Sequence, residues 1–392
     1  MYLADSSGRE MMKPIVILGT GLAGYGVAKE LRKKGASAPL ILITQDDGRF
    51  YSKPMLSGAL GKGQDADALA SASAEKMAQD LDAEVRVHTS VDAIDTAAAE
   101  ITIGAERIAY ASLVLAVGSS PIRPPMQGSG AEDVLSVNNL GDYARFRAAL
   151  EGTKRVAVIG PGLIGCEFAN DLLQIQRDVT LIGPDKWPIS ALLPEQAGRA
   201  LQQSMAQAGA QWELETFNGD IEKTADGYRT ELKNGHVVEA DLILSAVGVR
   251  ANIGLAKEAG VTVNRGIVTD AQMQTSAPNV YAIGDCAEAH GRNLPFVAPL
   301  LLQTKAVAAT LTGTPTEVAY PHMPVIIKTT LHPIVTLPPA PGAAGAWQVE
   351  GDAEGVLGRF HNEAGEMIGF CVTGNQTAQK SALVKQMAPV GG

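Results

Sequence analysis

The chain has 392 residues, of which 46% are hydrophobic and 19% charged, a composition typical of a globular enzyme. Its length exceeds what one hydrophobic core supports and predicts about two or three domains. The formal net charge of −10 argues against nucleic acid as the main partner. No apolar run is long enough for a membrane span, so none is expected. Cys166, Cys286 and Cys371 lie far apart without metal-ligand spacing, which predicts no metal site and favours a cytoplasmic location.

Residues 1–13 are polar and are expected to form a disordered N-terminal extension. The next stretch, IVILGTGLAG at 15–24, predicts a buried strand at 15–18 and a helix at 22–34. Between them Gly19, Gly21 and Gly24 have the GxGxxG spacing. Such a turn exposes backbone N–H groups at the positive end of the helix dipole, where they bind the pyrophosphate of a dinucleotide. The stretch therefore predicts a dinucleotide site.

An acidic residue about twenty positions beyond such a motif usually binds the ribose hydroxyls. The predicted second strand, 40–44, ends instead at Thr44, and Asp46 follows it. We assign the ribose role to Asp46. The alternative is that Asp46 belongs only to a polar turn at 46–48.

The region between this unit and residue 125 has weaker patterns. Residues 49–63 predict a loop with a short helix, 65–82 an exposed helix, and 119–125 a linker. A buried strand is predicted at 113–118. Short strands of a small antiparallel excursion are predicted at 85–89, 91–95, 101–103 and 107–109.

The pattern then repeats. VAVIGPGLIG at 156–165 has a second GxGxxG in Gly160, Gly162 and Gly165. The match continues between 27–31 and 168–172, between 40–44 and 179–183, and between 116–118 and 246–248. Two similar nucleotide-binding domains imply two dinucleotides, the arrangement that passes a hydride from one to the other.

The last part of the chain begins with a strand at 280–283 that ends at Gly284 and Asp285. A helix is predicted at 299–312, with its inward face formed by Leu300, Leu301, Val307, Ala308 and Leu311. After Tyr320 the pattern predicts a small α+β domain with strands at 324–328, 334–337, 347–350, 356–361 and 367–372 and a helix at 376–387. The predicted fold is α/β, with two Rossmann-like domains and this small C-terminal domain.

The two GxGxxG motifs and the segment from Thr275 to Asp285 resemble those of the pyridine nucleotide-disulfide oxidoreductase superfamily. The fold of this superfamily is glutathione-reductase-like. The resemblance implies a discontinuous FAD-binding domain at 14–120 and 249–318. It also implies an NAD(P)H-binding domain at 121–248 and a C-terminal interface domain at 319–392.

Within this superfamily the absence of a CxxC pair argues against disulfide reduction. No cysteine precedes Cys166, which disfavours the peroxide- and oxygen-reducing members. The segment FYSKPMLS at 50–57, with Lys53 and Pro54, resembles a motif of the branch that reduces small electron carriers. The segments 142–146, 163–171, 263–268 and 320–329 resemble bacterial rubredoxin–NAD(+) reductases.

The resemblance implies an FAD-dependent enzyme that takes a hydride from NADH and passes single electrons to rubredoxin or a similar small iron-sulfur or iron protein. Such an enzyme supplies an alkane hydroxylase or an oxidative-stress system. The alternatives are a ferredoxin or flavorubredoxin reductase and, in another class, a flavoprotein redox sensor.

The resemblance also implies roles for individual residues. Lys53 would stabilise charge near the flavin, Glu167 would contact the nicotinamide region, and Lys328 would contact flavin or partner; these three are the candidate catalytic residues. Alternatively, Lys53 is a solvated loop lysine, Glu167 is a charge that stabilises the first helical turn, and Lys328 is a surface lysine. Asp285 would bind the FAD ribitol or cap a helix.

The choice between NADH and NADPH depends on the residues after the second strand of the repeat. Of these, Lys186 favours NADPH. The adjacent Asp185, however, can bind ribose hydroxyls, and no pair of arginines is present to bind a 2′-phosphate. NADH is therefore favoured over NADPH. The candidate cofactor-binding residues are Gly19, Gly21, Leu22, Ala23, Gly24, Asp46, Lys53, Pro54, Val91, Ala116, Gly118, Asp285, Val297, Gly160, Gly162, Leu163, Ile164, Gly165, Glu167, Asp185 and Gly248. Because rubredoxins are usually acidic, docking on this acidic chain is expected to need a local basic rim that includes Lys53 and Lys328.

Overall fold

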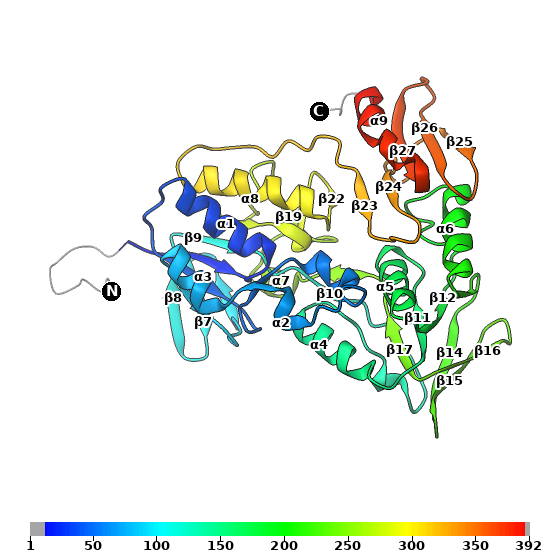
Figure 1. Cartoon of the computed structure of the whole chain (residues 1–392). Helices are drawn as coiled ribbons and strands as arrows, with labels where there is room; N and C mark the ends of the chain where they lie inside the picture. Colours follow the sequence, from blue (N-terminus) through cyan, green and yellow to red (C-terminus); the bar gives the residue numbers. More distant parts are fainter. Residues whose placement is uncertain (1–11, 389–392) are drawn as a thin grey trace. The chain divides into compact units, whose positions relative to one another are not determined.

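The structure is a computed structural model that describes residues 12–388, so the expected disorder of 1–13 falls almost wholly outside the described residues. The described chain divides into two compact units (Figure 1). Unit 1 comprises 12–53, 70–120 and 250–320, and unit 2 comprises 54–69, 121–249 and 321–388. The segment 54–69 lies in unit 2, whereas the predicted FAD-binding domain contains it. The three predicted domains remain a prediction.

Unit 1 is built on a parallel sheet with strand order β20-β9-β1-β2-β5. Its strands are β1 (Ile15–Leu18), β2 (Leu40–Ile43), β5 (Glu84–Arg86), β9 (Ser112–Leu115) and β20 (Val280–Ala282). The central strands β1 and β2 are continuous apolar runs, as is typical of a parallel sheet covered on both faces. Helices α1 (Leu22–Lys33) and α8 (Val297–Leu311) lie side by side (Figure 1). Leu300, Val307 and Ala308 of α8 are buried as predicted, but Leu301 is 46% exposed, so the predicted inward face was wrong at that position.

Two predictions for 65–89 were wrong. The expected single helix is divided into α2 (Ala66–Leu69), β4 (Ala70–Ala72) and α3 (Ala74–Leu81). Strand β4 pairs with β3 (Phe50–Tyr51), and the Ser73 side chain caps α3 by accepting a hydrogen bond from the Lys76 N–H at 3.2 Å. The strand predicted at 85–89 belongs to the parallel sheet, where β5 pairs with β2 and Val85 packs against the core of unit 1.

The antiparallel excursion consists of β6 (Ala93–Asp95), β7 (Glu100–Ile103) and β8 (Glu106–Ala109). The predicted linker contains a short strand, β10 (Ser119–Pro121), which pairs with β18 (Val249–Ala251). The remaining elements of unit 1 are α7 (Gly254–Glu258), β19 (Ile267–Thr269), the 3₁₀ helix η3 (Gly284–Cys286), β21 (Ala287–Ala289) and β22 (Arg292–Asn293).

Unit 2 contains the second copy of the repeat. Its parallel sheet has the order β13-β12-β11-β17, which corresponds to β5-β2-β1-β9 of unit 1, so the sequence repeat is a repeat of topology. The elements are β11 (Arg155–Ile159), α5 (Leu163–Gln174), β12 (Asp178–Ile182), α6 (Glu195–Gln207), β13 (Gln211–Glu213) and β17 (Leu242–Ser245). Added to them are the 3₁₀ helices η1 (Lys53–Gly58) and η2 (Ala131–Asp133), helix α4 (Leu140–Ala149), and an antiparallel sheet of β14 (Asn218–Thr224), β15 (Gly227–Leu232) and β16 (Val237–Ala240).

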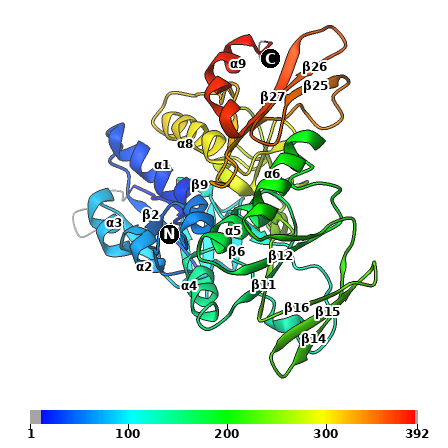
Figure 2. The same cartoon turned by 45° about the vertical axis from the view of Figure 1, so that its right-hand side comes forward.

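The C-terminal part of unit 2 is an antiparallel sheet with the order β23-β24-β27-β26-β25. Its five strands confirm the predicted ones: β23 (Val325–Ile327), β24 (Ile334–Leu337), β25 (Ala346–Gly351), β26 (Val356–His361) and β27 (Met367–Thr373). The predicted last helix is divided into the 3₁₀ helix η4 (Gly374–Gln379) and α9 (Lys380–Gln386). Helix α9 buries Leu383 against this sheet, and α6 lies beside β26 and β27 (Figure 2). Within residues 12–388, no helix has the length and apolarity needed to cross a bilayer.

Candidate functional site

The first glycine turn, Gly19–Gly24, joins β1 to α1 and is shaped by close backbone packing. Gly19 has φ +111°, and a Cβ there would lie 2.2 Å from the Ala116 carbonyl oxygen. A Cβ on Gly24 would lie 1.8 Å from the Gly19 oxygen. A Cβ on Gly21, in contrast, would have no described atom within 4 Å. The outer two glycines are therefore required by packing, and the middle one borders open space.

The second glycine turn, Gly160–Gly165, joins β11 to α5 in the same way. Gly160 has φ +104°, a Cβ on Gly165 would lie 1.9 Å from the Gly160 oxygen, and Gly162 again borders open space. Both α1 and α5 begin after a glycine N-cap, with no side-chain cap and no acidic residue in the first turn. Their first N–H groups are thus left for an anion. Both turns fit a dinucleotide pyrophosphate.

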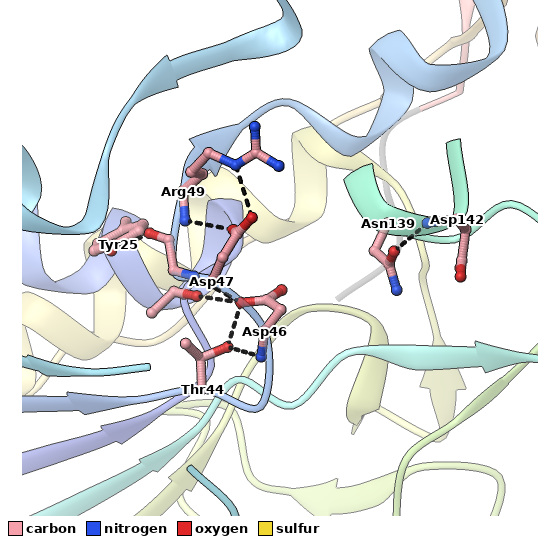
Figure 3. A network of polar contacts seen from close by, with 9 residues as sticks. Tyr25, Thr44, Asp46, Asp47, Arg49, Asn139 and Asp142 are labelled. Carbon is pink, nitrogen blue, oxygen red and sulfur yellow. Dashed lines mark hydrogen bonds and ion pairs between the residues drawn. The ribbon is translucent and has the colours of Figure 1, made fainter. Parts of the chain in front are cut away.

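Asp46 is held at the carboxyl end of β2 by a small network of polar contacts (Figure 3). Its Oδ1 accepts hydrogen bonds from the Thr44 hydroxyl at 2.7 Å, the Gly48 N–H at 3.1 Å and the Thr20 hydroxyl at 3.4 Å. Thr44, where the sequence lacks the usual acid, orients the carboxylate that follows it. The ribose role of Asp46 remains a prediction.

The equivalent residue of the second copy is Asp185. The last residue of β2 that pairs with β1 is Ile43, and Asp46 lies three positions later. In the same way, the last residue of β12 that pairs with β11 is Ile182, and Asp185 lies three positions later. Asp185 accepts a hydrogen bond from the Ser190 hydroxyl and lines a shallow cavity of about 390 Å³ with Pro184, Lys186 and Trp187. The cavity lies where the ribose end of a nucleotide is expected in this fold.

Lys53 and Asp285, predicted from distant segments to contact one cofactor, lie together in unit 1. The Lys53 ammonium is 3.6 Å from Asp285 Oδ2 and 3.4 Å from the Ser119 hydroxyl, which donates to Asp285 Oδ2 at 2.8 Å. Residues 119–125 were predicted to form a linker, and this contact of Ser119 was not predicted. The only signal for it was its position directly after Gly118. The Lys53 side chain is 37% exposed, so this ion pair adds little to stability and leaves positive charge accessible.

Glu167 and Lys328, also predicted separately, form an ion pair in unit 2. Glu167 lies on α5 and is 0% exposed, and Lys328 follows β23 and is 33% exposed. Glu167 Oε1 accepts a hydrogen bond from the Lys328 N–H at 2.8 Å, while Oε2 contacts the Lys328 ammonium. Oε2 also accepts a hydrogen bond at 2.6 Å from the Ser57 hydroxyl, a residue to which the sequence assigned no role. These donors compensate the burial of the carboxylate.

One turn further along α5, Asp171 is a second buried carboxylate. It accepts hydrogen bonds from the backbone N–H groups of Leu60 at 2.7 Å and Gly61 at 2.8 Å. Burial raises the pKa of the Asp171 carboxyl, although these N–H groups oppose the shift. The approach is so close that a Cβ on Gly61 would lie 2.3 Å from Gln174 Oε1.

The remaining candidates lie at the edges of these features. Ala116 is buried after β9, and Gly118 and Gly248 have φ +66° and +114° at corresponding turns. Val91 is half-buried against the unit 1 core, whereas Val297 at the start of α8 is 37% exposed. In the first helical turns lie Leu22, Ala23, Leu163 and Ile164, and Pro54 lies in η1.

The three cysteines are free and buried in the described chain. Burial raises the pKa of each thiol, to about 11 for Cys286 and about 12 for Cys371, so none has the thiolate character of a redox-active cysteine.

Comparison with known proteins agrees with this geometry. Residues 13–309 match the pyridine nucleotide-disulphide oxidoreductase family, and residues 317–387 match the rubredoxin binding C-terminal domain. The chain is 44% identical to a rubredoxin-NAD(+) reductase of Alcanivorax borkumensis, over 97% of this chain and 100% of that one. It is 36% identical to a nitric oxide reductase FlRd-NAD(+) reductase of Aeromonas hydrophila, over 99% and 100%.

The fold agrees with that of a solved ferredoxin reductase for the CYP199A2 system of Rhodopseudomonas palustris, with a TM-score of 0.87, 24% identity and 96% of each chain covered. The matches to the family and to full-length relatives cover nearly all of the described chain. The chain therefore belongs to the pyridine nucleotide-disulphide oxidoreductase family, in the group of the rubredoxin-NAD(+) reductases and their flavorubredoxin-reducing relatives.

Proposed function

We propose that this chain is an NADH-dependent rubredoxin reductase that contains FAD. The observation that carries the proposal is the Glu167–Lys328 ion pair inside unit 2. It joins the helix of the second glycine turn to the C-terminal segment that matches a rubredoxin binding domain. One side-chain pair thus connects the nucleotide-binding copy with the segment that would receive the electron acceptor.

As a member of this family the chain uses a pyridine nucleotide and a flavin. A flavin accepts two electrons as a hydride and releases them singly, which is the conversion that an iron protein requires. We assign FAD to the first glycine turn, because Asp46 and the Lys53–Asp285 pair lie in the same unit. The Lys53 ammonium would stabilise negative charge on the reduced ring system.

We assign NADH to the second glycine turn. The Asp185 carboxylate would accept hydrogen bonds from the ribose hydroxyls and would repel the 2′-phosphate of NADPH. Glu167, held by Ser57 and Lys328, would orient the nicotinamide end of the same nucleotide. Hydride transfer needs no general acid or nucleophile here, so these side chains act by position and charge.

The direct test is cytochrome c reduction by NADH with candidate acceptors added separately. Rubredoxin should stimulate the rate and ferredoxin should not. If only ferredoxin or only flavorubredoxin stimulated the rate, that protein would be the acceptor instead of rubredoxin, and the assignment of the cofactor sites would stand. Slow turnover even with ferricyanide would favour a redox sensor instead.

Docking of an acidic rubredoxin on a chain of net charge −10 requires local positive charge, for which Lys53 and Lys328 are candidates. We expect kcat/KM for rubredoxin to fall by about tenfold between 20 mM and 500 mM salt, because screening removes electrostatic steering. A rate that is independent of salt would contradict this docking model. We further propose a cytoplasmic location, which the three unpaired thiols support.

A further inference from the structure

Helix α5 presents polar side chains along one face, at positions 167, 170, 171 and 174, and these hold two distant segments of unit 2. Asn170 Oδ1 accepts a hydrogen bond from the Leu331 N–H at 3.0 Å, and the Asn170 amide donates to the Thr330 hydroxyl at 3.2 Å. Together with the Glu167 contacts, these bonds fix segment 328–331 against the helix. The segment therefore has a defined position relative to the second glycine turn.

The same face of α5 fixes segment 57–61. Asp171 accepts hydrogen bonds from two successive backbone N–H groups there, and a Cβ on Gly61 would lie 2.9 Å from Asp171 Oδ1, so a side chain at that position would have to displace this carboxylate. Backbone N–H groups bound by a buried carboxylate cannot shift without leaving that charge unpaired, which is strongly unfavourable. The Asp171 contacts therefore determine where Ser57 lies.

The Glu167 carboxylate accepts hydrogen bonds from side chains of both segments. Its Oε2 receives the Ser57 hydroxyl from one segment and the Lys328 ammonium from the other. At 0% exposure its carboxylate has no solvent donor to replace either partner. Removing the Ser57 hydroxyl would leave Oε2 with Lys328 alone, and the buried carboxylate could then rotate or move with the lysine.

We propose that Ser57 is a positioning residue that acts through Glu167: its buried hydroxyl fixes the Glu167 carboxylate, and with it the Lys328 ammonium, in the geometry used for hydride transfer. The proposal rests on the proposed function, because it gives Glu167 and Lys328 their place beside the nicotinamide. Asp171 supports this geometry by holding the segment that carries Ser57. The nucleotide is also bound by the glycine turn and by Asp185, which Ser57 does not contact, so the effect should fall on the chemical step.

The test compares Ser57→Ala with Ser57→Thr in the holoenzyme. In stopped-flow measurements, flavin reduction by saturating NADH should slow about tenfold in Ser57→Ala, which corresponds to about 1.4 kcal/mol, and Thr should restore it to within about threefold. NAD⁺ affinity, measured by calorimetry, should stay within about twofold. Wild-type reduction rates for Ser57→Ala would overturn the proposal, and so would a calorimetric affinity that falls as much as the rate.

A double-mutant cycle separates positioning from general destabilisation. If Ser57 acts through Glu167, Ser57→Ala should cause no further loss in a Glu167→Gln enzyme, whereas additive losses would overturn the proposal. Thr230→Val is the matched control, because it removes another buried hydroxyl of unit 2, one that has no partner among the described residues, and it should leave the reduction rate unchanged. If Ser57→Ala fails to fold, Ser57→Cys, which keeps a weak donor of similar size, takes its place in the same cycle.

Flavin reduction by NADH does not depend on the identity of the protein acceptor. If rubredoxin fails to stimulate cytochrome c reduction, the proposed acceptor is wrong, but the double-mutant cycle of Ser57 and Glu167 still tests the positioning role of Ser57. If rubredoxin stimulates normally but the cycle is additive, only the positioning role is wrong.

Discussion

The two glycine turns have nearly the same backbone, and the fifth position of the helix that follows each turn is used differently. The fifth residue of α1 is Gly26, and the fifth residue of α5 is Glu167. A Cβ on Gly26 would lie 2.9 Å from the Thr304 methyl group, because α1 packs directly on α8. Glu167 instead contacts Ser57 and Lys328. The same local fold is therefore used in one copy for helix packing and in the other for placing a charge.

The largest expected effects come from the third glycine of each turn. Gly24→Ala and Gly165→Ala create almost equal clashes with a backbone oxygen, at 1.8 and 1.9 Å, and each should destabilise its unit by about 3 kcal/mol. Their consequences should differ, because the first turn is assigned to FAD and the second to NADH. Gly24→Ala should lose bound flavin, measured by absorbance. Gly165→Ala should retain flavin and bind NAD⁺ at least about tenfold more weakly by calorimetry.

Gly254→Ala is the control, because its Cβ would meet no described atom within 4 Å, and its stability should change by less than about 0.5 kcal/mol. Loss of flavin in Gly165→Ala with retention in Gly24→Ala would reverse the assignment of the two sites.

The equivalent aspartates should separate the two nucleotides further. Asp185→Ala should raise KM for NADH about tenfold and reduce the preference over NADPH, because the ribose hydroxyls lose their acceptor. Asp46→Ala should leave KM for NADH unchanged and weaken flavin retention. Steady-state kinetics with both nucleotides, and flavin release on dilution, measure these effects. An unchanged KM in Asp185→Ala would contradict the assignment of the second turn.

The packing at the fifth helical position can be tested directly in α1. Gly26→Ala should reduce the free energy of unfolding by about 1 kcal/mol, because the clash with Thr304 outweighs the better helix propensity of alanine. Thr304→Ser removes the clashing methyl group and should restore stability in the double mutant. Urea denaturation of the four proteins measures the coupling. Additive losses would show that Thr304 does not restrict this position.

The smallest expected effect is a pH dependence in the C-terminal sheet of unit 2. His332, which directly follows the segment 328–331 held by α5, is 3% exposed, and its Nε2 lies 2.8 Å from the Thr373 hydroxyl. Burial lowers the pKa of His332 below its usual value of about 6.5, so the unfolded chain takes up the proton first as pH falls. Stability should therefore decrease by about 1 kcal/mol between pH 7.5 and 5.5.

His332→Gln cannot take up that proton, so its free energy of unfolding should depend less on pH by the same amount. Urea denaturation at the two pH values, followed by tryptophan fluorescence, measures the difference. Equal pH dependence in both proteins would mean that His332 is not the group responsible.

Local pattern was enough to predict most of the elements. Apolar runs bounded by glycine predicted the central strands of both parallel sheets, and the GxGxxG spacing predicted both turns, because these features depend on residues close together in the chain. The five C-terminal strands were predicted for the same reason. The errors at 65–89 and at Leu301 arose where partners distant in sequence decide the structure: β3 pairs with β4, β2 pairs with β5, and the packing of α8 leaves Leu301 exposed.

The sequence by itself determined that this protein has two dinucleotide turns, a family resemblance and the separate candidates Lys53, Glu167, Asp285 and Lys328. Only the tertiary structure decided which of them meet: Lys53 pairs with Asp285 beside Ser119, and Glu167 pairs with Lys328 beside Ser57. Partners such as Ser57 and Glu167 are more than a hundred positions apart. No local periodicity encodes such a contact, because it depends on how separately folded segments pack around one helix.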